Sequence, residues 1–439
     1  MATLRRSLHL PDATALVIGC VIGAGIFRTA ASISKHLHEP WLVMAVWAAG
    51  GAISFCGALC YAELAAAYPK TGGDYVYIRK AYGPLAGFLF GWTKIFTERV
   101  GTIAVLGFVF AEYAASVFGL NPIQTKELAS VAILGLTWAN IAGIHLGKGV
   151  QNLLTVVKLC ALLAIIGAGL AAGAAAANSL PPPAPTPLNF QTLQAFGVAL
   201  VFVLWTYGGW TESAYVAEEI HDPHRNLPWS ILLGLGVVTL LYLAVNWVYM
   251  RVIPLSEMPG KPLVAAEVMR MSLGPAGATL TSLMIASSAF GALNGYILTS
   301  GRILLAMGRD QPLFSRLAEV HPVFATPARA LGFNALVAML LVWIGTFDQI
   351  VTYSTVVISV FFAMGAAAVI VLRVRDPETP RPYRVWGYPV TPVLFILALG
   401  LFVASNAWAQ PKETMLGFLL AAAGLPLYFW SEGLLRRNG

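Results

Sequence analysis

Charged residues are scarce in this chain of 439 residues. Asp, Glu, Lys and Arg make up 11% of it, whereas a soluble protein has about 25%. No stretch is long and polar enough to form a separate soluble domain. Hydrophobic residues make up 58%, and apolar runs long enough to cross a bilayer recur from end to end. The sequence therefore predicts an all-α polytopic membrane protein.

Cysteine and histidine are also scarce, at four and seven residues. All four cysteines lie in predicted membrane segments and lack metal-ligand spacing with histidine: Cys20, Cys56, Cys60 and Cys160. We therefore expect no structural disulfide. His221 and His224 lie beside Asp-Pro and Leu-Pro pairs, which explain a tight turn without a metal. We expect no bound metal and no cofactor. We also expect no enzymatic activity, because neither a nucleophile with a base nor a metal-ligand cluster falls at membrane depth.

Twelve apolar runs are candidates for membrane helices: 12–35, 41–67, 84–116, 128–146, 150–173, 193–217, 229–251, 275–306, 328–347, 350–372, 390–409 and 414–434. The first follows Arg5 and Arg6, as in a signal peptide. It is long and leads into further spans, so we interpret it as an uncleaved first helix. A channel is not favoured, because the spans carry no continuous polar stripe.

Basic residues are distributed unevenly between alternate loops. Of the 27 Lys and Arg residues, 17 fall on the side of the N-terminus, six on the other side and four within spans. This positive-inside bias predicts a multi-pass protein of the cell membrane, inner or plasma, with both termini cytoplasmic. It also argues against a nucleic-acid surface.

The first span is interrupted by Gly19-Cys20-Val21-Ile22-Gly23-Ala24-Gly25-Ile26-Phe27. Glycine lets the backbone leave helical dihedrals and lets a ligand approach the main chain. A helix that restarts after this stretch would present unpaired N–H groups and a positive dipole end to an anion such as a carboxylate. The same glycines also fit close helix packing.

The sixth span repeats this theme at Val203-Leu204-Trp205-Thr206-Tyr207-Gly208-Gly209-Trp210-Thr211-Glu212. Glycine-interrupted spans at matching positions of two halves indicate a transporter built from inverted repeats, with its substrate at the midplane. We expect a first five-helix repeat at 1–175, a second, inverted one at 190–375, and two further helices within 376–439.

Several ionisable residues lie within or beside the spans. Lys94 and Glu98 are four residues apart, which favours an ion pair on one helix face. Lys158 has no acidic residue within a helical turn, so its ammonium would need oxygens from other helices or lose its proton. Glu63 fits either an inner gate that pairs with a loop cation or a helix cap.

Several ordered motifs resemble the amino acid/polyamine/organocation (APC) superfamily, and within it the L-type amino acid transporter branch and its prokaryotic relatives. They are Ile22-Gly23-Ala24-Gly25-Ile26-Phe27, Tyr61-Ala62-Glu63-Leu64 with Pro69-Lys70-Thr71-Gly72-Gly73-Asp74-Tyr75, Trp205-Thr206-Tyr207-Gly208-Gly209-Trp210, Asp222-Pro223 through Leu227-Pro228, and Gly291-Ala292-Leu293-Asn294-Gly295. The resemblance implies the leucine-transporter-type fold, with a 5+5 inverted repeat, broken helices 1 and 6 and two extra helices.

The resemblance also implies roles for individual residues. The N–H groups of Gly23, Ala24 and Gly25 would hold the substrate carboxylate, and Trp205 would be a gating lid over the substrate. Carbonyls around Ile22, Trp205, Thr206 and Gly208 would accept from the substrate ammonium. Lys158 would replace a bound sodium ion by bridging Gly19 and either Ser287 or Ser288, which implies sodium-independent transport.

Two departures from the family pattern matter. Many relatives carry a serine at the position of Ala24, so only backbone contacts to the carboxylate remain here. Eukaryotic members join an accessory glycoprotein through a cysteine in the loop that corresponds to Gly119–Glu127. This loop has none, so we expect no disulfide-linked accessory subunit.

The leading hypothesis is therefore sodium-independent transport of neutral L-amino acids by exchange, through alternating access in the lipid bilayer. One alternative is a transporter of cationic amino acids or amines, if Glu212 faces the pocket. The other is proton-coupled symport through Lys158.

Overall fold

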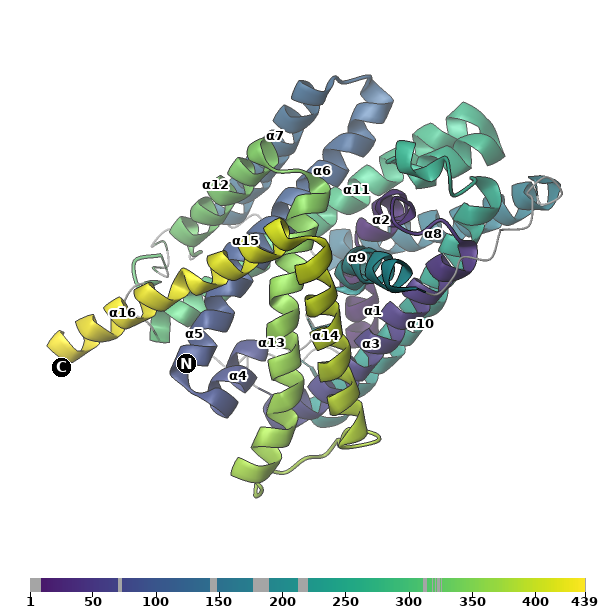
Figure 1. The fold of residues 1–439 in the computed structure, drawn as a ribbon. Helices are drawn as coiled ribbons and strands as arrows, with labels where there is room; N and C mark the ends of the chain where they lie inside the picture. Colours follow the sequence, from purple (N-terminus) through teal and green to yellow (C-terminus); the bar gives the residue numbers. More distant parts are fainter. Residues whose placement is uncertain are drawn as a thin grey trace.

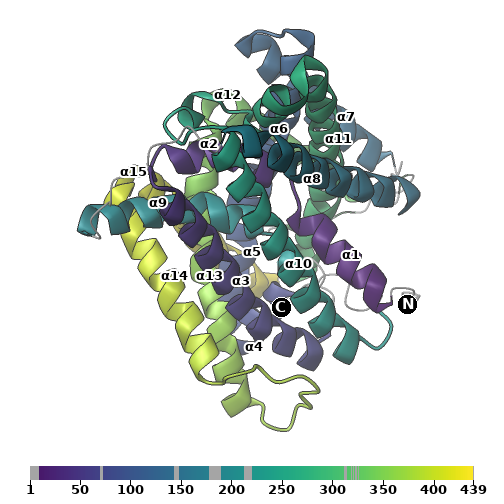
Figure 2. The ribbon, with the colours of Figure 1, turned by 90° about the vertical axis from the view of Figure 1, so that its right-hand side faces the viewer.

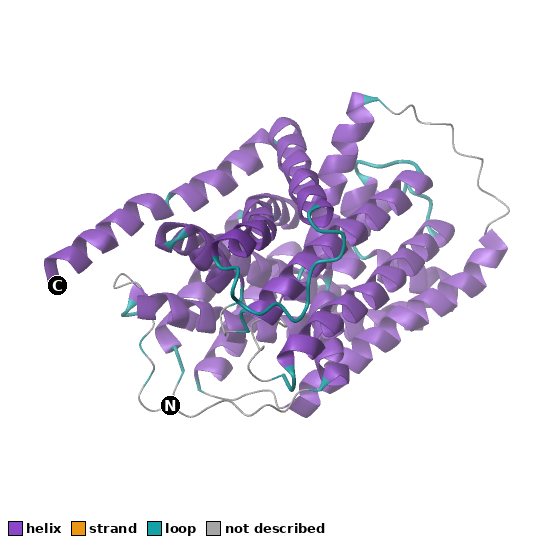
Figure 3. Cartoon of the chain, turned by 90° about the horizontal axis from the view of Figure 1, so that it is seen from below, coloured by secondary structure: helices purple, strands orange, loops and turns teal. Residues whose placement is uncertain are grey.

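The computed structural model describes residues 9–69, 73–142, 148–176, 189–211, 220–310, 314–317, 319, 321, 324 and 326–438. Within these residues the regular elements are all helices (Figure 3). In chain order they are α1 (Leu10–Val21), α2 (Gly25–Ser34), α3 (Pro40–Ala67), α4 (Asp74–Tyr82), α5 (Pro84–Thr93), η1 (Lys94–Arg99), α6 (Val100–Phe118), α7 (Pro122–Ile141), α8 (Lys148–Ala176), α9 (Phe190–Tyr207), α10 (Pro223–Val252), η3 (Met258–Gly260), α11 (Val264–Asp310), α12 (Ala328–Ile344), α13 (Phe347–Arg375), α14 (Val390–Ala409), α15 (Pro411–Ala422) and α16 (Gly424–Asn438).

Nine helical segments of the described chain are long and apolar enough to cross a membrane. Shorter apolar helices lie at Val156–Ala172 and Ala328–Ile344. These findings confirm an all-helical chain suited to a polytopic membrane protein. The number of twelve spans and the division into two inverted repeats remain predictions.

The first predicted break is present. α1 ends at Val21 and α2 begins at Gly25, and Figure 2 shows them as two separate purple helices. Between them Ile22 adopts φ −72° and ψ 79°, which is not helical. The chain can leave the helix here because Gly23 and Gly25 flank a small residue, Ala24.

The second break is described on one side only. α9 ends at Tyr207, and Gly208 leaves the helix with ψ 157°. Gly209 has φ +102°, a value that glycine adopts without strain. Residues 212–219 lie outside the described part of the chain, so Glu212 and the predicted restart of this helix are not described.

The two breaks are brought together by helices that are distant in the sequence. α10 packs against both α1 and α3, and α9 packs against both α2 and α3 (Figure 2). α13 lies beside α14 and also contacts α3, α6 and α9 (Figure 1). The ends of α1 and α9 therefore meet inside the bundle.

The third apolar run forms one continuous helix whose middle segment is not α-helical. α5 continues into η1, a π-helical segment, and then into α6. π-Helical turns inside α-helices are rare and are often found at functional sites. This turn contains Lys94, Glu98 and Arg99, three of the ionisable residues that the sequence places within spans.

Candidate substrate-binding site

A cavity lies where the two helix breaks meet. Gly23, Ala24 and Gly25 line it from the first break, and Trp205, Thr206 and Gly208 line it from the second. Its wall is completed by side chains from α3, η1, α6, α11, α13 and α14. The structure thus brings together six of the seven residues predicted to bind substrate. Ile22 is fully buried between the same helices.

Backbone N–H groups at the start of α2 are available to a ligand. In the described part of the chain, the N–H groups of Ala24, Gly25 and Ile26 have no hydrogen-bond partner. The N–H of Gly23 differs from our expectation, because it donates to the carbonyl of Val21 at 2.7 Å. The positive end of α2 therefore presents three unpaired donors, shifted by one residue from the predicted set.

The backbones of the two breaks are in direct contact. A β-carbon added to Gly209 would lie 2.8 Å from the carbonyl oxygen of Cys20. The hydroxyl of Tyr242 on α10 reaches both breaks, since it lies 2.8 Å from the carbonyl oxygen of Val21 and 3.3 Å from that of Thr206. Carbonyls that lost their helical partners at the breaks are thus held by a buried side chain.

Trp205 covers the start of α2. A β-carbon added to Gly25 would lie 2.8 Å from the Trp205 ring, so only glycine allows this approach. The ring also packs edge-on against Phe347 at 5.7 Å between centroids, and the Arg28 guanidinium lies 4.6 Å above the centroid of Phe347. Trp205 is therefore placed between the cavity and a layer of side chains from α2 and α13.

Lys158 on α8 contacts the first break. Its buried ammonium donates to the carbonyl of Gly19 at 2.8 Å. Ser287 is exposed, whereas Ser288 is fully buried and its hydroxyl has no hydrogen-bond partner within the described residues. Burial thus singles out Ser288 of the two serines predicted beside Lys158, and no hydrogen bond joins them among the described contacts.

Lys94 and Glu98 form an ion pair in the cavity wall. The Lys94 ammonium lies 3.3 Å from Glu98 Oε2, and the lysine side chain is only 2% exposed while that of Glu98 is 17% exposed. Both residues line the cavity. The sequence predicts the pair from its spacing, but the spacing does not indicate that the pair faces the same space as the helix breaks.

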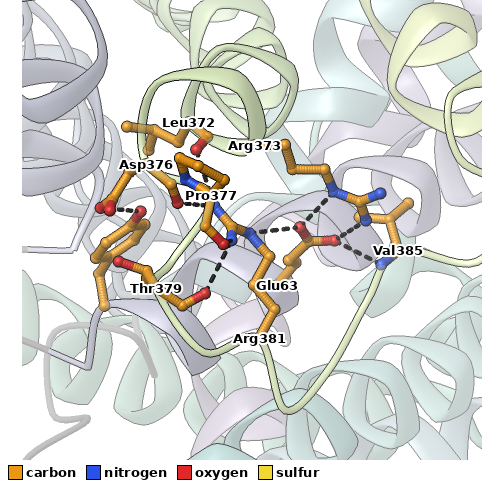
Figure 4. A network of polar contacts seen from close by, with 9 residues as sticks. Glu63, Leu372, Arg373, Asp376, Pro377, Thr379, Arg381 and Val385 are labelled. Atoms are coloured by element: carbon orange, nitrogen blue, oxygen red, sulfur yellow. Dashed lines mark hydrogen bonds and ion pairs between the residues drawn. The ribbon is translucent and has the colours of Figure 1, made fainter.

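Glu63 is the centre of a polar network where α3 ends (Figure 4). Arg373 donates to its two carboxylate oxygens at 2.8 and 2.5 Å, Arg381 lies at 3.6 Å, and the N–H of Val385 donates at 2.7 Å. Glu63 thus pairs with Arg373 in the last turn of α13 and with the loop cation Arg381; its role as an inner gate remains a prediction. The network joins α3, the end of α13 and the segment before α14.

Asp376 extends this network. It accepts hydrogen bonds from Lys80 at 2.6 Å and from Tyr68 at 2.9 Å. The hydrogen bond from Lys80, followed by those from Thr379 and Tyr68, lowers the pKa of Asp376 to about 2. Burial raises the pKa of Tyr68, and its hydrogen bond to Asp376 adds to that rise. Asp376 therefore stays charged at any pH near neutrality.

A second set of ion pairs lies where α3 begins. Arg28 pairs with Glu112 at 2.8 Å, and Lys35 pairs with Asp348 at 2.6 Å. Ser32 donates to the same aspartate at 2.7 Å. These contacts join α2 to α6 and α13, so both ends of the bundle are held by polar contacts.

Metal-ligating residues do not gather in the described ranges, where no group of three or more His, Cys, Asp or Glu could hold a metal ion. The four cysteines are free. The site therefore offers backbone donors and carbonyls, one ion pair, several hydroxyls and an aromatic cover. This chemistry suits the reversible binding of a small zwitterion.

An apolar helical bundle with a cavity between the ends of α1 and α9 is typical of membrane transport proteins. The sequence model of the amino acid permease family matches residues 8–429. The chain belongs to this family, within the APC superfamily, which confirms the resemblance seen in the sequence.

Similar proteins include members from bacteria and mammals. The chain is 31% identical over 430 residues to the serine/threonine exchanger SteT of Bacillus subtilis (strain 168), covering 97% of each protein. It is 31% identical over 432 residues to the large neutral amino acids transporter small subunit 2 of Mus musculus, covering 97% of this chain and 81% of the other. It is 31% identical over 441 residues to the human b(0,+)-type amino acid transporter 1, covering 97% of this chain and 88% of the other.

Tyr242 and Arg373 are two residues of these contacts that the sequence analysis does not single out. Tyr242 lies in an apolar run without an unusual neighbour, so nothing in the sequence marks it. Arg373 counts only as one of the basic residues on the side of the N-terminus. A cation at a helix end gives no hint that its partner is Glu63, 310 residues earlier in the chain.

Proposed function

We propose that this protein transports neutral L-amino acids across a cell membrane, independently of sodium and by exchange. The observation that carries the proposal is the start of α2, where the N–H groups of Ala24, Gly25 and Ile26 have no hydrogen-bond partner among the described residues and where Ala24 and Gly25 line the cavity. A helix N-terminus with free donors favours a carboxylate. Carbonyls near Trp205 and Gly208, at the end of α9, suit the ammonium group of the same substrate.

Sodium independence is supported by Lys158. Its ammonium contacts the Gly19 carbonyl at 2.8 Å and would supply a positive charge at the first break. A lysine ammonium at the first break would take the place of a bound sodium ion there. The names of two relatives, a large neutral amino acids transporter and a serine/threonine exchanger, support the parts of the proposal that concern neutral amino acids and exchange.

Alternating access would proceed around the two breaks. The Glu63 network would lie on the cytoplasmic side, with both termini, and the Arg28–Glu112 pair on the outer side. Opening one side would separate one set of ion pairs while the other remains closed. In this scheme 1–175 and 190–375 move as two inverted five-helix repeats, with 376–439 supporting them.

The proposal is tested with the purified full chain in sodium-free proteoliposomes at equal pH on both sides. Labelled neutral L-amino acids should enter vesicles preloaded with unlabelled amino acid and enter empty vesicles poorly. Uptake that requires a sodium gradient would contradict the role of Lys158. Uptake into empty vesicles that an inward proton gradient accelerates would establish proton symport instead of exchange.

A further inference from the structure

The Lys94–Glu98 pair belongs to neither of the two helix breaks that are proposed to hold the carboxylate and the ammonium of an amino acid. It lines the same cavity as the two helix breaks, but it comes from η1, on a different wall. Because the breaks bind the groups common to all amino acids, a wall formed by other helices meets the part that varies, the side chain. We propose that Glu98, held by Lys94, selects substrates whose side chain ends in a neutral hydrogen-bond donor, an amide or a hydroxyl.

This inference rests on the proposed function and concerns the same cavity. Its first support is the different burial of the two partners. Lys94 is 2% exposed, whereas Glu98 is 17% exposed. Glu98 is thus the member of the pair whose side chain is more accessible from the cavity. A carboxylate accepts hydrogen bonds and does not donate them, so it favours a side chain that carries a donor.

The second support is hydrogen-bonding capacity that the described residues leave unused. Glu98 Oε2 is buried without a hydrogen bond of acceptable geometry, although Lys94 lies 3.3 Å away. Thr355 on α13 lines the same cavity, is 5% exposed, and its hydroxyl has no partner within the described chain. α13 packs against η1, so both groups belong to neighbouring parts of the wall. An amide can donate to Glu98 and accept from Thr355.

Charge explains why the donor must be neutral. Lys94 compensates Glu98, and Arg99 Nε lies 3.9 Å from the same carboxylate. A cationic side chain would therefore add a further cation beside an already paired carboxylate. An anionic side chain would face Glu98 directly and be repelled. An apolar side chain would cover the carboxylate without satisfying it, and a buried charged group without its hydrogen bonds is costly.

Isosteric amino acids provide the test. Affinities of the purified full chain for L-asparagine and L-leucine, and for L-threonine and L-valine, are measured by isothermal titration calorimetry without sodium. A hydrogen bond to a charged group predicts that the donor-bearing member of at least one couple binds about tenfold more tightly. The asparagine couple tests the amide, and the threonine couple tests the hydroxyl.

The double variant Lys94→Met/Glu98→Leu replaces the pair by apolar side chains of similar length. For each amino acid couple in which the wild type prefers the donor-bearing member, this variant should bind the two members with nearly equal affinity, that is, with an affinity ratio close to one. The matched control is Glu257→Leu/Lys261→Met, which removes another i,i+4 ion pair, at 3.0 Å, that does not line the cavity. The control should keep the wild-type ratio. Should the double variant not fold, Glu98→Gln, a weaker neutral acceptor, should still lower the ratio severalfold.

The outcomes separate the inference from the function on which it rests. Equal binding of both members of each couple by the wild type, or tighter binding of leucine and valine, would overturn the inference and leave amino acid transport standing. An unchanged ratio in the double variant, or in Glu98→Gln, would show that the pair serves folding only. No binding of any amino acid would overturn the proposed function itself.

Discussion

The hydroxyl of Tyr242 lies 2.8 Å from the carbonyl oxygen of Val21, the last residue of α1. The same hydroxyl lies 3.3 Å from the carbonyl oxygen of Thr206, one residue before the end of α9. One side chain of α10 thus fixes the distance between the two breaks. Because the cavity lies between them, this contact helps to set its width.

Tyr242→Phe should weaken amino acid binding by about two- to tenfold, the effect of losing one hydrogen bond. Isothermal titration with the purified protein measures the change. Tyr249→Phe is the matched control, because Tyr249 is buried on the same helix and its hydroxyl has no partner in the described structure. An equal loss in both variants would mean that the Tyr242 hydroxyl has no special role.

Lys158→Ala should abolish or uncouple transport while the protein remains folded, since the carbonyl of Gly19 loses its cationic partner. Uptake into sodium-free proteoliposomes measures this loss, and gel filtration checks the fold. Lys412→Ala is the control, because Lys412 is exposed at the start of α15. Transport by Lys158→Ala at the wild-type rate would contradict the proposed role of this lysine.

Gly25→Leu should block substrate binding. Its β-carbon alone would lie 2.8 Å from the Trp205 ring and 2.9 Å from the Thr206 hydroxyl, so the aromatic cover must move. Gly167→Leu is the control, because nothing lies within 4 Å of a β-carbon built there. Unchanged affinity in Gly25→Leu would show that this glycine serves helix packing alone.

Glu63→Gln should lower the free energy of unfolding by about 3 kcal/mol, because it leaves two arginines without their carboxylate. Thermal unfolding in detergent provides the measurement. The control is Glu319→Gln, whose ion pair with Arg329 is more than half exposed on both sides and should contribute at most about 1 kcal/mol. Equal shifts in the two variants would argue against a structural role for the buried network.

The contacts of Asp376 should stabilise the folded protein above about pH 4 and lose this effect at lower pH. Its folded-state pKa is lowered to about 2, whereas an unfolded aspartate titrates near about 3.9. Stability is therefore fully present above the unfolded pKa and is lost as the pH falls towards the folded pKa. The difference in melting temperature between wild type and Asp376→Asn should be constant from about pH 5 to 7 and shrink below about pH 4. A difference that grows on acidification would contradict this assignment.

Features that depend on local sequence were predictable. The glycines at 23 and 25 predict the break that the structure contains, and the spacing of Lys94 and Glu98 predicts their pairing. The apolar run predicts that the fourth span starts at residue 128, whereas α7 begins at Pro122. The sequence does contain a signal for this earlier helix start, because Asn121 and Gln124 form a capping box around a proline at the first helical position.

Features that depend on contacts between distant segments were not predictable. Glu63 and Arg373 are 310 residues apart, and Tyr242 and Val21 are 221 apart. Neither contact leaves a periodic pattern in the sequence. The contact of Lys158 with Gly19 was expected only through the family resemblance, since spacing could say no more than that the lysine needed oxygens from other helices.

The π-helical turn at Lys94–Arg99 has a further consequence for how this helix can vary. A π turn closes its hydrogen bonds over one residue more than an α turn does, so it acts as a one-residue insertion within a continuous helix. Deleting one residue there would convert the turn to an α turn and leave Thr102 and Leu106 facing the cavity that they line, whereas a deletion elsewhere in the helix would rotate everything that follows by about 100°. A deletion at this turn would therefore change the cavity wall at Lys94 and Glu98 and keep the orientation of the lining residues that follow in α6.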